Sequence, residues 1–166
     1  MAVNAFINFN GAAPGESIQK GKENWIEIQA WDWEVEAATN VTMGGGAAAG
    51  KTNPGKLRFE HFFNTSSTVL LAYSCTGKAF PKLELHMLRI MGKGNPETYF
   101  AMTMENVVIT KVSNAGNAEG RIVQKVELAF KTVKIDYWAQ DPRTGLSSGL
   151  KSFNWNIQTN VASATG

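Results

Sequence analysis

Cysteine, long apolar runs and export signals are scarce or missing in this chain, and each shortage excludes a class of protein. Cys75 is the only cysteine among 166 residues, so neither an internal disulfide nor a cysteine zinc cluster is expected. No apolar stretch approaches the roughly 20 residues of a transmembrane helix, so membrane insertion is not expected. The first ten residues lack a basic segment followed by an apolar core, so no standard signal peptide is predicted. We therefore expect a cytoplasmic protein that, if it leaves the cell, bypasses the general export route.

A strong excess of charge of one sign is also missing. The 16 Lys and Arg residues nearly balance the 14 Asp and Glu residues, for a net charge of +2, and no basic block stands out. A dedicated binder of nucleic acid or of anionic membranes is therefore not expected. The length suits one domain over residues 1–166, and a hydrophobic content of 43% is ordinary for a globular protein.

What the sequence does contain is alternation of apolar and polar residues, the pattern of half-buried β-strands. In two segments, 25–37 and 121–137, the apolar parity switches part way along, which indicates a bulge or a strand that crosses between sheets. One helix is expected, capped by Ser66 or Ser67 and ended by Gly77. The prediction is an all-β fold, a two-sheet β-barrel or sandwich with one short α-helix, followed by a flexible tail over 161–166. Parity and spacing place these larger side chains in the core: Trp31, Trp33, Phe59, Leu70, Tyr73, Phe153 and Trp155.

Residues Gly45 to Thr52 match the phosphate-loop pattern G-x-x-x-x-G-K-[ST]. A phosphate loop needs a buried strand before it and a helix that begins at the Lys. Here the sequence continues into Asn53-Pro54-Gly55, which is a turn signal and disfavours a helix. We therefore interpret the match as accidental and predict a long, flexible loop of small residues over 39–56.

Candidate catalytic residues are few and scattered. His61 and His86 lie in different expected strands without metal-ligand spacing, and Cys75 is expected to be a small, partly buried side chain near a helix C-terminus. Asp32, Glu34 and Glu36 share one strand face, which favours a solvated acidic surface over a site for a hard cation or a carboxylate pair. No enzyme activity, metal or cofactor is predicted. Five Trp residues leave open a monomeric carbohydrate-binding β-sandwich, although their parity favours packing.

The order of several short motifs resembles one known family. The chain begins Met-Ala-Val-x-x-Phe-Ile-x-Phe, continues with Gly15-Glu16-Ser17 and then with Trp-Ile-Glu-Ile-Gln-Ala-Trp-Asp-Trp over 25–33. A Gly/Ala-rich loop, a strand followed by a helix over 57–77, and a final Phe-x-Trp-Asn-Ile-x-x-Asn over 153–160 follow. In this order and spacing, the motifs are similar to the haemolysin-coregulated proteins (Hcp) over essentially the whole chain.

The resemblance implies a structural subunit of the type VI secretion system. Proteins of this family form hexameric rings that stack into an inner tube, inside a contractile sheath and behind a spike protein at the tip. Contraction expels the tube, and effectors can travel in its lumen. A tail-tube protein of a phage or phage-like particle, which would share fold and mechanics, stays open as an alternative.

The resemblance also assigns residues. Asp32, with Glu34 and Glu36, is implied to face the lumen and to contact cargo. An extended inter-ring loop is implied for Met43, Gly44, Gly45, Gly46, Ala47, Ala48, Ala49, Gly50 and Lys51. The subunit seam is expected to involve edge pairing and polar contacts of the N-terminal segment and of residues 121–134.

Overall fold

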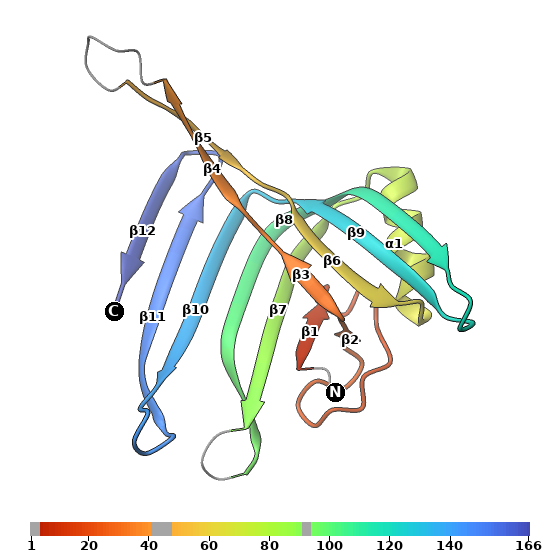
Figure 1. Ribbon diagram of the computed structural model, residues 1–166. Helices are drawn as coiled ribbons and strands as arrows, with labels where there is room; N and C mark the ends of the chain where they lie inside the picture. The colour runs from red at the N-terminus through yellow and green to blue at the C-terminus, as the bar shows by residue number, and fades with distance from the viewer. Residues whose placement is uncertain (1–3, 41–47, 91–93) are drawn as a thin grey trace.

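The computed structural model describes residues 4–40, 48–90 and 94–166, in which twelve strands and one helix are found (Figure 1). The strands are β1 (Ala5–Asn8), β2 (Ile26–Glu27), β3 (Ala30–Asp32), β4 (Val35–Asn40), β5 (Ala48–Pro54), β6 (Leu57–Phe62), β7 (Phe80–Ile90), β8 (Pro96–Gly116), β9 (Ile122–Ala129), β10 (Thr132–Gln140), β11 (Ser147–Asn156) and β12 (Val161–Thr165), and the helix is α1 (Thr65–Thr76). The predicted all-β class with one short helix is confirmed.

The strands form a large and a small antiparallel sheet that share β8. The large sheet has the order β12-β11-β10-β8-β7-β1-β2, and the small sheet adds β9, β6 and β3 beside the second half of β8. Up to Val107, β8 pairs with β7 and β10, and from Val108 onward it pairs with β9. Asn106 lies at this change of partner with a left-handed φ of 52°, a conformation that Asn tolerates better than most residues.

The parity switch over residues 25–37 marks a crossing between sheets, although the segment contains three short strands and not one. Ile26 in β2 pairs with β1 of the large sheet, and Trp31 in β3 pairs with β6 of the small sheet. Between them, the Ile28 amide donates to the Ala5 carbonyl oxygen and the Gln29 amide to that of Glu60. The segment over 121–137 divides in the same way, into β9 and β10.

The core lies between the two sheets and beneath α1. Phe9 contacts Phe80 with ring centroids 4.4 Å apart, and Tyr73 of the helix stacks on Phe80 at 4.0 Å. Of the side chains expected in the core, three are buried and four are half-buried against it: Phe59, Leu70 and Trp155 in the first group, and Trp31, Trp33, Tyr73 and Phe153 in the second. Full burial of one such large side chain contributes about 1.5–3 kcal/mol.

The helix begins two or three residues earlier than predicted. Asn64 is the N-cap, because its side-chain oxygen accepts from the Ser66 amide and its own amide donates to Ser67 Oγ. Gly77 ends the helix with φ 67°, as predicted. Cys75, expected to be partly buried, is exposed on the last turn.

Two segments predicted to be irregular form strands. The expected loop over 39–56 is largely the β4–β5 hairpin, in which Val35 pairs with Pro54 and Glu36 with Asn53. Its residues 41–47, which include Met43, Gly44, Gly45, Gly46 and Ala47, lie outside the described residues. The expected flexible tail contains β12, which pairs with β11 from Asn156 to Ser152. Backbone pairing therefore orders these Ala- and Gly-rich stretches despite their low strand propensity.

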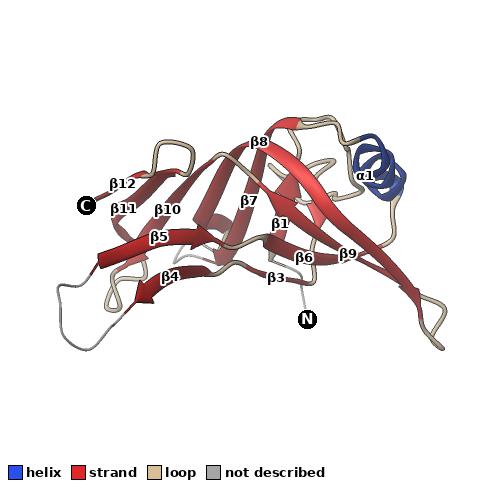
Figure 2. Ribbon diagram, turned by 90° about the horizontal axis from the view of Figure 1, so that it is seen from above, coloured by secondary structure: helices blue, strands red, loops and turns tan. Residues whose placement is uncertain are grey.

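Strands β10 to β12, which we call the wing, continue the large sheet beyond the small sheet (Figure 2). In Figure 1 the wing occupies the left of the molecule and α1 the right, while the β4–β5 hairpin projects at the top.

Candidate functional site

The three acidic residues predicted to face a lumen do not share a single strand. Asp32 ends β3, Glu34 lies in the connection that follows, and Glu36 belongs to the β4–β5 hairpin. All three are exposed, with 64% of the Asp32 side chain and 77% of the Glu34 side chain accessible. The chain passes from the small sheet into the hairpin at this point, and the three exposed acids lie along that passage.

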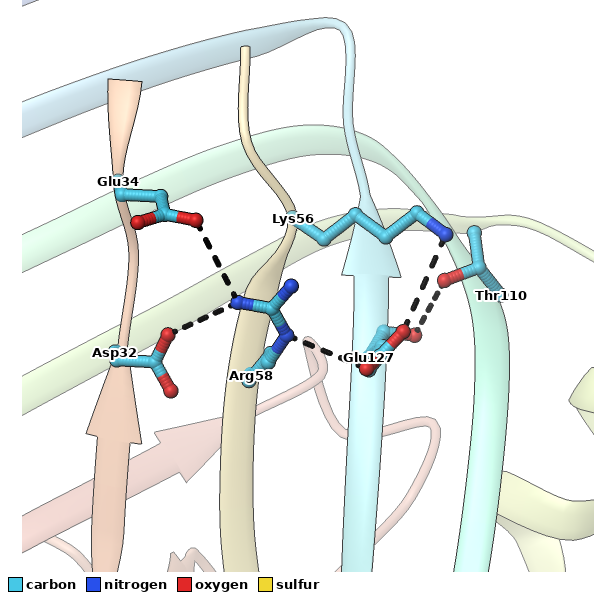
Figure 3. Close-up of polar contacts among 6 residues, drawn as sticks. All are labelled: Asp32, Glu34, Lys56, Arg58, Thr110 and Glu127. Atoms are coloured by element: carbon cyan, nitrogen blue, oxygen red, sulfur yellow. Dashed lines mark hydrogen bonds and ion pairs between the residues drawn. The ribbon is translucent and has the colours of Figure 1, made fainter. Parts of the chain in front are cut away.

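Arg58 forms ion pairs with two of these acids (Figure 3). Its Nη1 lies 3.2 Å from Asp32 Oδ2 and 4.0 Å from Glu34 Oε1, while its Nε lies 3.3 Å from Glu127 Oε1. Lys56 Nζ approaches Glu127 Oε2 at 4.0 Å, and the Thr110 hydroxyl donates to the Glu127 carbonyl oxygen. Hydrogen bonds from Arg58 to Asp32 and then to Glu127 raise the pKa of its guanidinium, so Arg58 stays charged.

The sheet register explains why these charges meet. Asp32 lies directly opposite Arg58 on the neighbouring strand, Arg58 opposite Glu127, and Glu127 opposite Lys111, so signs alternate across four strands. Opposite charges in such cross-strand positions attract, but exposed pairs contribute little each. A second pair, Lys125 Nζ and Glu60 Oε2 at 3.9 Å, lies on the same face.

This charged face carries a shallow groove of about 320 Å³. Its lining includes Trp31, Asp32, Arg58, Lys111 and Lys125. Because each sign has partners of the other sign within the groove, the surface is mixed in charge and not strongly acidic. Such a surface can contact polar segments of either sign through exposed pairs.

The base of the β4–β5 hairpin is fixed by contacts of Trp33 and Gly55. The Gly55 amide donates to the Glu34 carbonyl oxygen at 3.0 Å, and Trp33 Nε1 donates to the Gly55 carbonyl oxygen at 3.0 Å. The Trp33 ring packs edge-on against Phe130, with centroids 5.9 Å apart. A side chain at Gly55 would collide with the Glu34 carbonyl oxygen, so only glycine fits there.

The phosphate-loop match has the wrong context, as predicted. Lys51 and Thr52 lie within strand β5, which continues to Pro54, and no helix begins at the Lys. Among the described residues, no group of three or more His, Cys, Asp or Glu residues could hold a metal ion.

Both histidines pack against other side chains in the fold. His61 is fully buried, and its Nε2 lies 2.8 Å from Gln124 Oε1; burial lowers the pKa of His61. His86 is half-buried beside Trp25, and Lys22 Nζ donates to its Nδ1 at 2.6 Å. Burial, together with the Lys22 charge, lowers the pKa of His86 to about 4.

The five Trp residues are all described, and each is buried or half-buried. For Trp31, Trp33 and Trp155, which belong to the core or pack against it, this agrees with the packing role that their parity favours. Sequence reasoning missed the roles of Lys56, Arg58 and Glu127. The sequence shows that these residues occupy polar positions of their strands, but it does not show that β6 pairs with β3 and β9.

Comparisons with known proteins agree with this fold. The family model described as "Type VI secretion system effector, Hcp" matches residues 6–137. The protein hcp1 of Pseudomonas aeruginosa is 33% identical over 162 residues, which cover 97% of this chain and 99% of that protein. The crystal structure of Hcp1 from Salmonella typhimurium has a TM-score of 0.80 at 27% identity, covering 98% of this chain and 100% of the other. A type VI secretion system effector from Yersinia pestis has a TM-score of 0.74 at 26% identity, covering 92% and 99%.

Proposed function

Because the chain belongs to the Hcp family of type VI secretion proteins, we propose that it is a structural subunit of the secretion tube. Six copies form a ring, the rings stack into an inner tube inside a contractile sheath, and contraction expels the tube behind a spike protein. The subunit acts by assembly and not by catalysis. It is made in the cytoplasm and released with the tube.

The observation that carries this proposal is the family match over residues 6–137, together with the 33% identity to the Pseudomonas aeruginosa protein hcp1 over 97% of this chain. The described helix has twelve residues, and no helix in the described ranges is long and apolar enough to cross a membrane. The β4–β5 hairpin projects from the body at one end, where it could reach a neighbouring subunit (Figure 1). We assign to residues 43–51 the contact with the next ring.

The charged groove is assigned to the lumen, where secreted effectors would contact Asp32 and Glu34. Arg58 limits the negative charge there, so each copy contributes a mixed surface to the lumen. Asp32→Arg would place a second guanidinium beside Arg58. Because the 3.2 Å ion pair is exposed, we expect little change in folding or ring formation and a loss of effector binding. Asp32→Asn separates loss of charge from its reversal. Effectors that co-purify with the Asp32→Arg protein as they do with wild type would contradict this lumen assignment.

Secretion tests the proposal directly. The chain is expressed in a bacterium that has a working type VI system and lacks its own Hcp protein. We expect the protein in the culture medium only when the sheath gene is intact. Release that is independent of the sheath, or no release with normal expression, would contradict the proposed function.

Deletion of residues 44–50 tests the hairpin separately. The described parts of β4 and β5 that lie nearest the body, Val35–Glu36 and Asn53–Pro54, remain in this variant. We expect a folded protein that forms rings and stacks them poorly, measured by electron microscopy of purified protein. Tubes of wild-type length would contradict the assignment of an inter-ring contact to this segment.

A further inference from the structure

His86 lies on the outward face of the large sheet, where that face is covered. Leu85, its neighbour in β7, belongs to the core, so His86 points to the opposite side because strand side chains alternate. The register partners of His86 are Phe6 of β1 and Ala101 of β8, which are only 2% and 6% exposed. The connection between β1 and β2, residues 9–25, lies over this face (Figure 1) and places the Trp25 ring 4.8 Å from the His86 ring.

Backbone hydrogen bonds fix this connection around Lys22. The Lys22 amide donates to the Gln19 carbonyl oxygen at 2.8 Å, and the Trp25 amide donates to the Lys22 carbonyl oxygen at 3.2 Å. The Asn24 amide donates to the Ser17 carbonyl oxygen at 2.9 Å. Lys22 therefore occupies one defined backbone position, and its side chain starts beside Trp25.

The Lys22 amine is held between two rings. Its Nζ lies 2.6 Å from His86 Nδ1 and 4.2 Å from the centre of the Trp25 ring. Burial, together with the Lys22 charge, lowers the pKa of His86 to about 4, so the imidazole is neutral near pH 7 and its Nδ1 accepts the hydrogen bond. One N–H of Lys22 is thus directed at His86, which fixes the orientation of the nitrogen.

Lys22 differs from the other described lysines in its surroundings. Among the lysine side chains that the structure describes, only Lys22 and Lys82 are half-buried, and the rest are exposed. Lys82 Nζ forms an ion pair with Glu84 Oε1 at 3.2 Å, whereas Lys22 Nζ contacts a neutral ring nitrogen. Burial lowers the pKa of Lys22, and the charge of Glu84 opposes this effect. More of Lys22 is therefore present as the free amine than of an exposed lysine such as Lys20.

The charges around Lys22 are balanced. Lys82 and Glu84 lie on β7 with His86, Lys20 and Glu23 flank Lys22 in the connection, and Glu27 of β2 is the register partner of Phe6. The register partners of Glu84 and His86 on β1 and β8 are uncharged (Asn8, Phe6, Thr103 and Ala101). Neither sign dominates, so a small anionic reagent can approach the amine without strong repulsion.

We propose that Lys22 is a nucleophilic amine that accepts the acyl group of a small acyl phosphate, and that His86 and Trp25 position it. The ammonium group first loses a proton to solvent. The amine lone pair then attacks the acyl carbon, the C–N bond forms, and the C–O bond to phosphate breaks. Phosphate leaves with the electron pair of that bond, and the second proton of the nitrogen passes to solvent. A half-buried nitrogen between two rings favours a small donor over a bulky one.

The product fits the same contacts. The amide nitrogen of acylated Lys22 keeps one N–H, which still donates to His86 Nδ1. The charge whose partial burial is unfavourable is removed, so the modified side chain remains in place. Loss of that charge should also raise the pKa of His86 toward 6.5, because the Lys22 ammonium is one cause of its decrease. This chemistry does not depend on ring or tube formation.

The test treats the purified protein with acetyl phosphate and follows each lysine by mass spectrometry of its peptides. Lys20 is the internal control, because it is exposed in the same connection. We expect Lys22 to be acetylated several times faster than Lys20 at pH 7.5, and its rate to level off at a lower pH. In urea, where the fold is lost, the two rates should become equal. Equal rates in the folded protein, or a preference that persists in urea, would overturn the proposal.

Variants of His86 test its positioning role. His86→Gln keeps a hydrogen-bond acceptor and should keep most of the preference for Lys22, whereas His86→Leu removes the acceptor and should reduce it several-fold. If circular dichroism shows that His86→Leu is unfolded, Trp25→Leu takes its place. An undiminished preference in the Leu variant would overturn the positioning role. NMR titration of His86 in the acetylated wild type gives an independent readout, and an unchanged pKa there would contradict the contact with Lys22.

A bulkier donor tests the assignment of the acyl phosphate. Acetyl-coenzyme A carries the same acetyl group on a much larger leaving group. We expect the ratio of Lys22 to Lys20 acetylation to be several times smaller with this thioester than with acetyl phosphate. An equal or larger ratio with acetyl-coenzyme A would overturn the choice of a small acyl phosphate as the donor.

Discussion

Gly55→Ala should loosen the hairpin that we assign to ring stacking. The added methyl group would collide with the carbonyl oxygen of Glu34, a backbone atom that cannot rotate away as the end of a side chain can. To relieve the collision, the chain must separate Gly55 from Glu34. That movement breaks the hydrogen bond between them and strains the bond that Trp33 Nε1 donates to the Gly55 carbonyl oxygen.

The cost follows from these two contacts. Each hydrogen bond contributes about 0.5–1.5 kcal/mol, so losing one and weakening the other costs about 1–3 kcal/mol. In a domain of this size, 1 kcal/mol shifts the melting temperature by about 2–4 °C, so we expect a decrease of roughly 2–12 °C. Because the damage is local, amide hydrogen exchange should increase first in Val35 and Glu36 of β4.

Thermal unfolding and hydrogen exchange measure the two effects. Gly116→Ala is the matched control, because a Cβ at Gly116 meets no atom within 4 Å and its φ is not left-handed. That control should stay within about 0.5 kcal/mol of wild type. A Gly55→Ala protein with wild-type melting temperature and unchanged exchange in β4 would refute the account of the hairpin base.

Three further predictions concern stability. Because folding lowers the pKa of His86 from 6.5 to about 4, the folded protein binds fewer protons in that interval, so stability should fall as pH decreases from 6.5 toward 4. His86→Gln should reduce this loss of stability by about 1–2 kcal/mol, a figure that allows for the partial exposure of His86. Urea unfolding at each pH measures the loss. An NMR titration that gives His86 a pKa near 6.5 would contradict the prediction. Gly77→Ala adds a Cβ that meets no other atom, but at a residue with a left-handed φ of 67°. We therefore expect thermal unfolding to show a loss of about 1 kcal/mol from backbone strain alone. A stabilised variant would contradict the role of Gly77 as the helix C-cap. Leu70→Ala removes a fully buried helix anchor and should cost about 2–5 kcal/mol in denaturant unfolding; a loss below 1 kcal/mol would show that α1 is not held by this contact.

Much of the fold could be predicted from the sequence because its strands alternate strictly. The parity switch near Trp31 indicates the crossing between sheets, and Gly77 marks the end of the helix. The helix start was misassigned because Asn64, Ser66 and Ser67 can all act as caps, and only the geometry shows which amide each oxygen meets. The hairpin and β12 were missed because their Ala, Gly and Ser residues carry no apolar alternation. Their order comes from pairing with a neighbouring strand, which composition does not reveal.

Of the candidate site, the sequence predicted the acidic residues and not the basic residue that pairs with them. Asp32 was visible from its position between Trp31 and Trp33, and Glu34 from the same parity two residues later. Their partner Arg58 is 26 positions from Asp32 and 24 from Glu34 along the chain, and it lies beside them only because β6 is antiparallel to β3 in one particular register. Glu127 enters the same network through the pairing of β6 with β9. A one-residue change in either register would place these side chains on the core face.

The mass of the purified protein across a wide concentration range tests the central claim most directly. The account predicts a dominant species at six times 18.1 kDa, visible as an annulus by electron microscopy. A species at 18.1 kDa throughout that range, with no annuli, would contradict it.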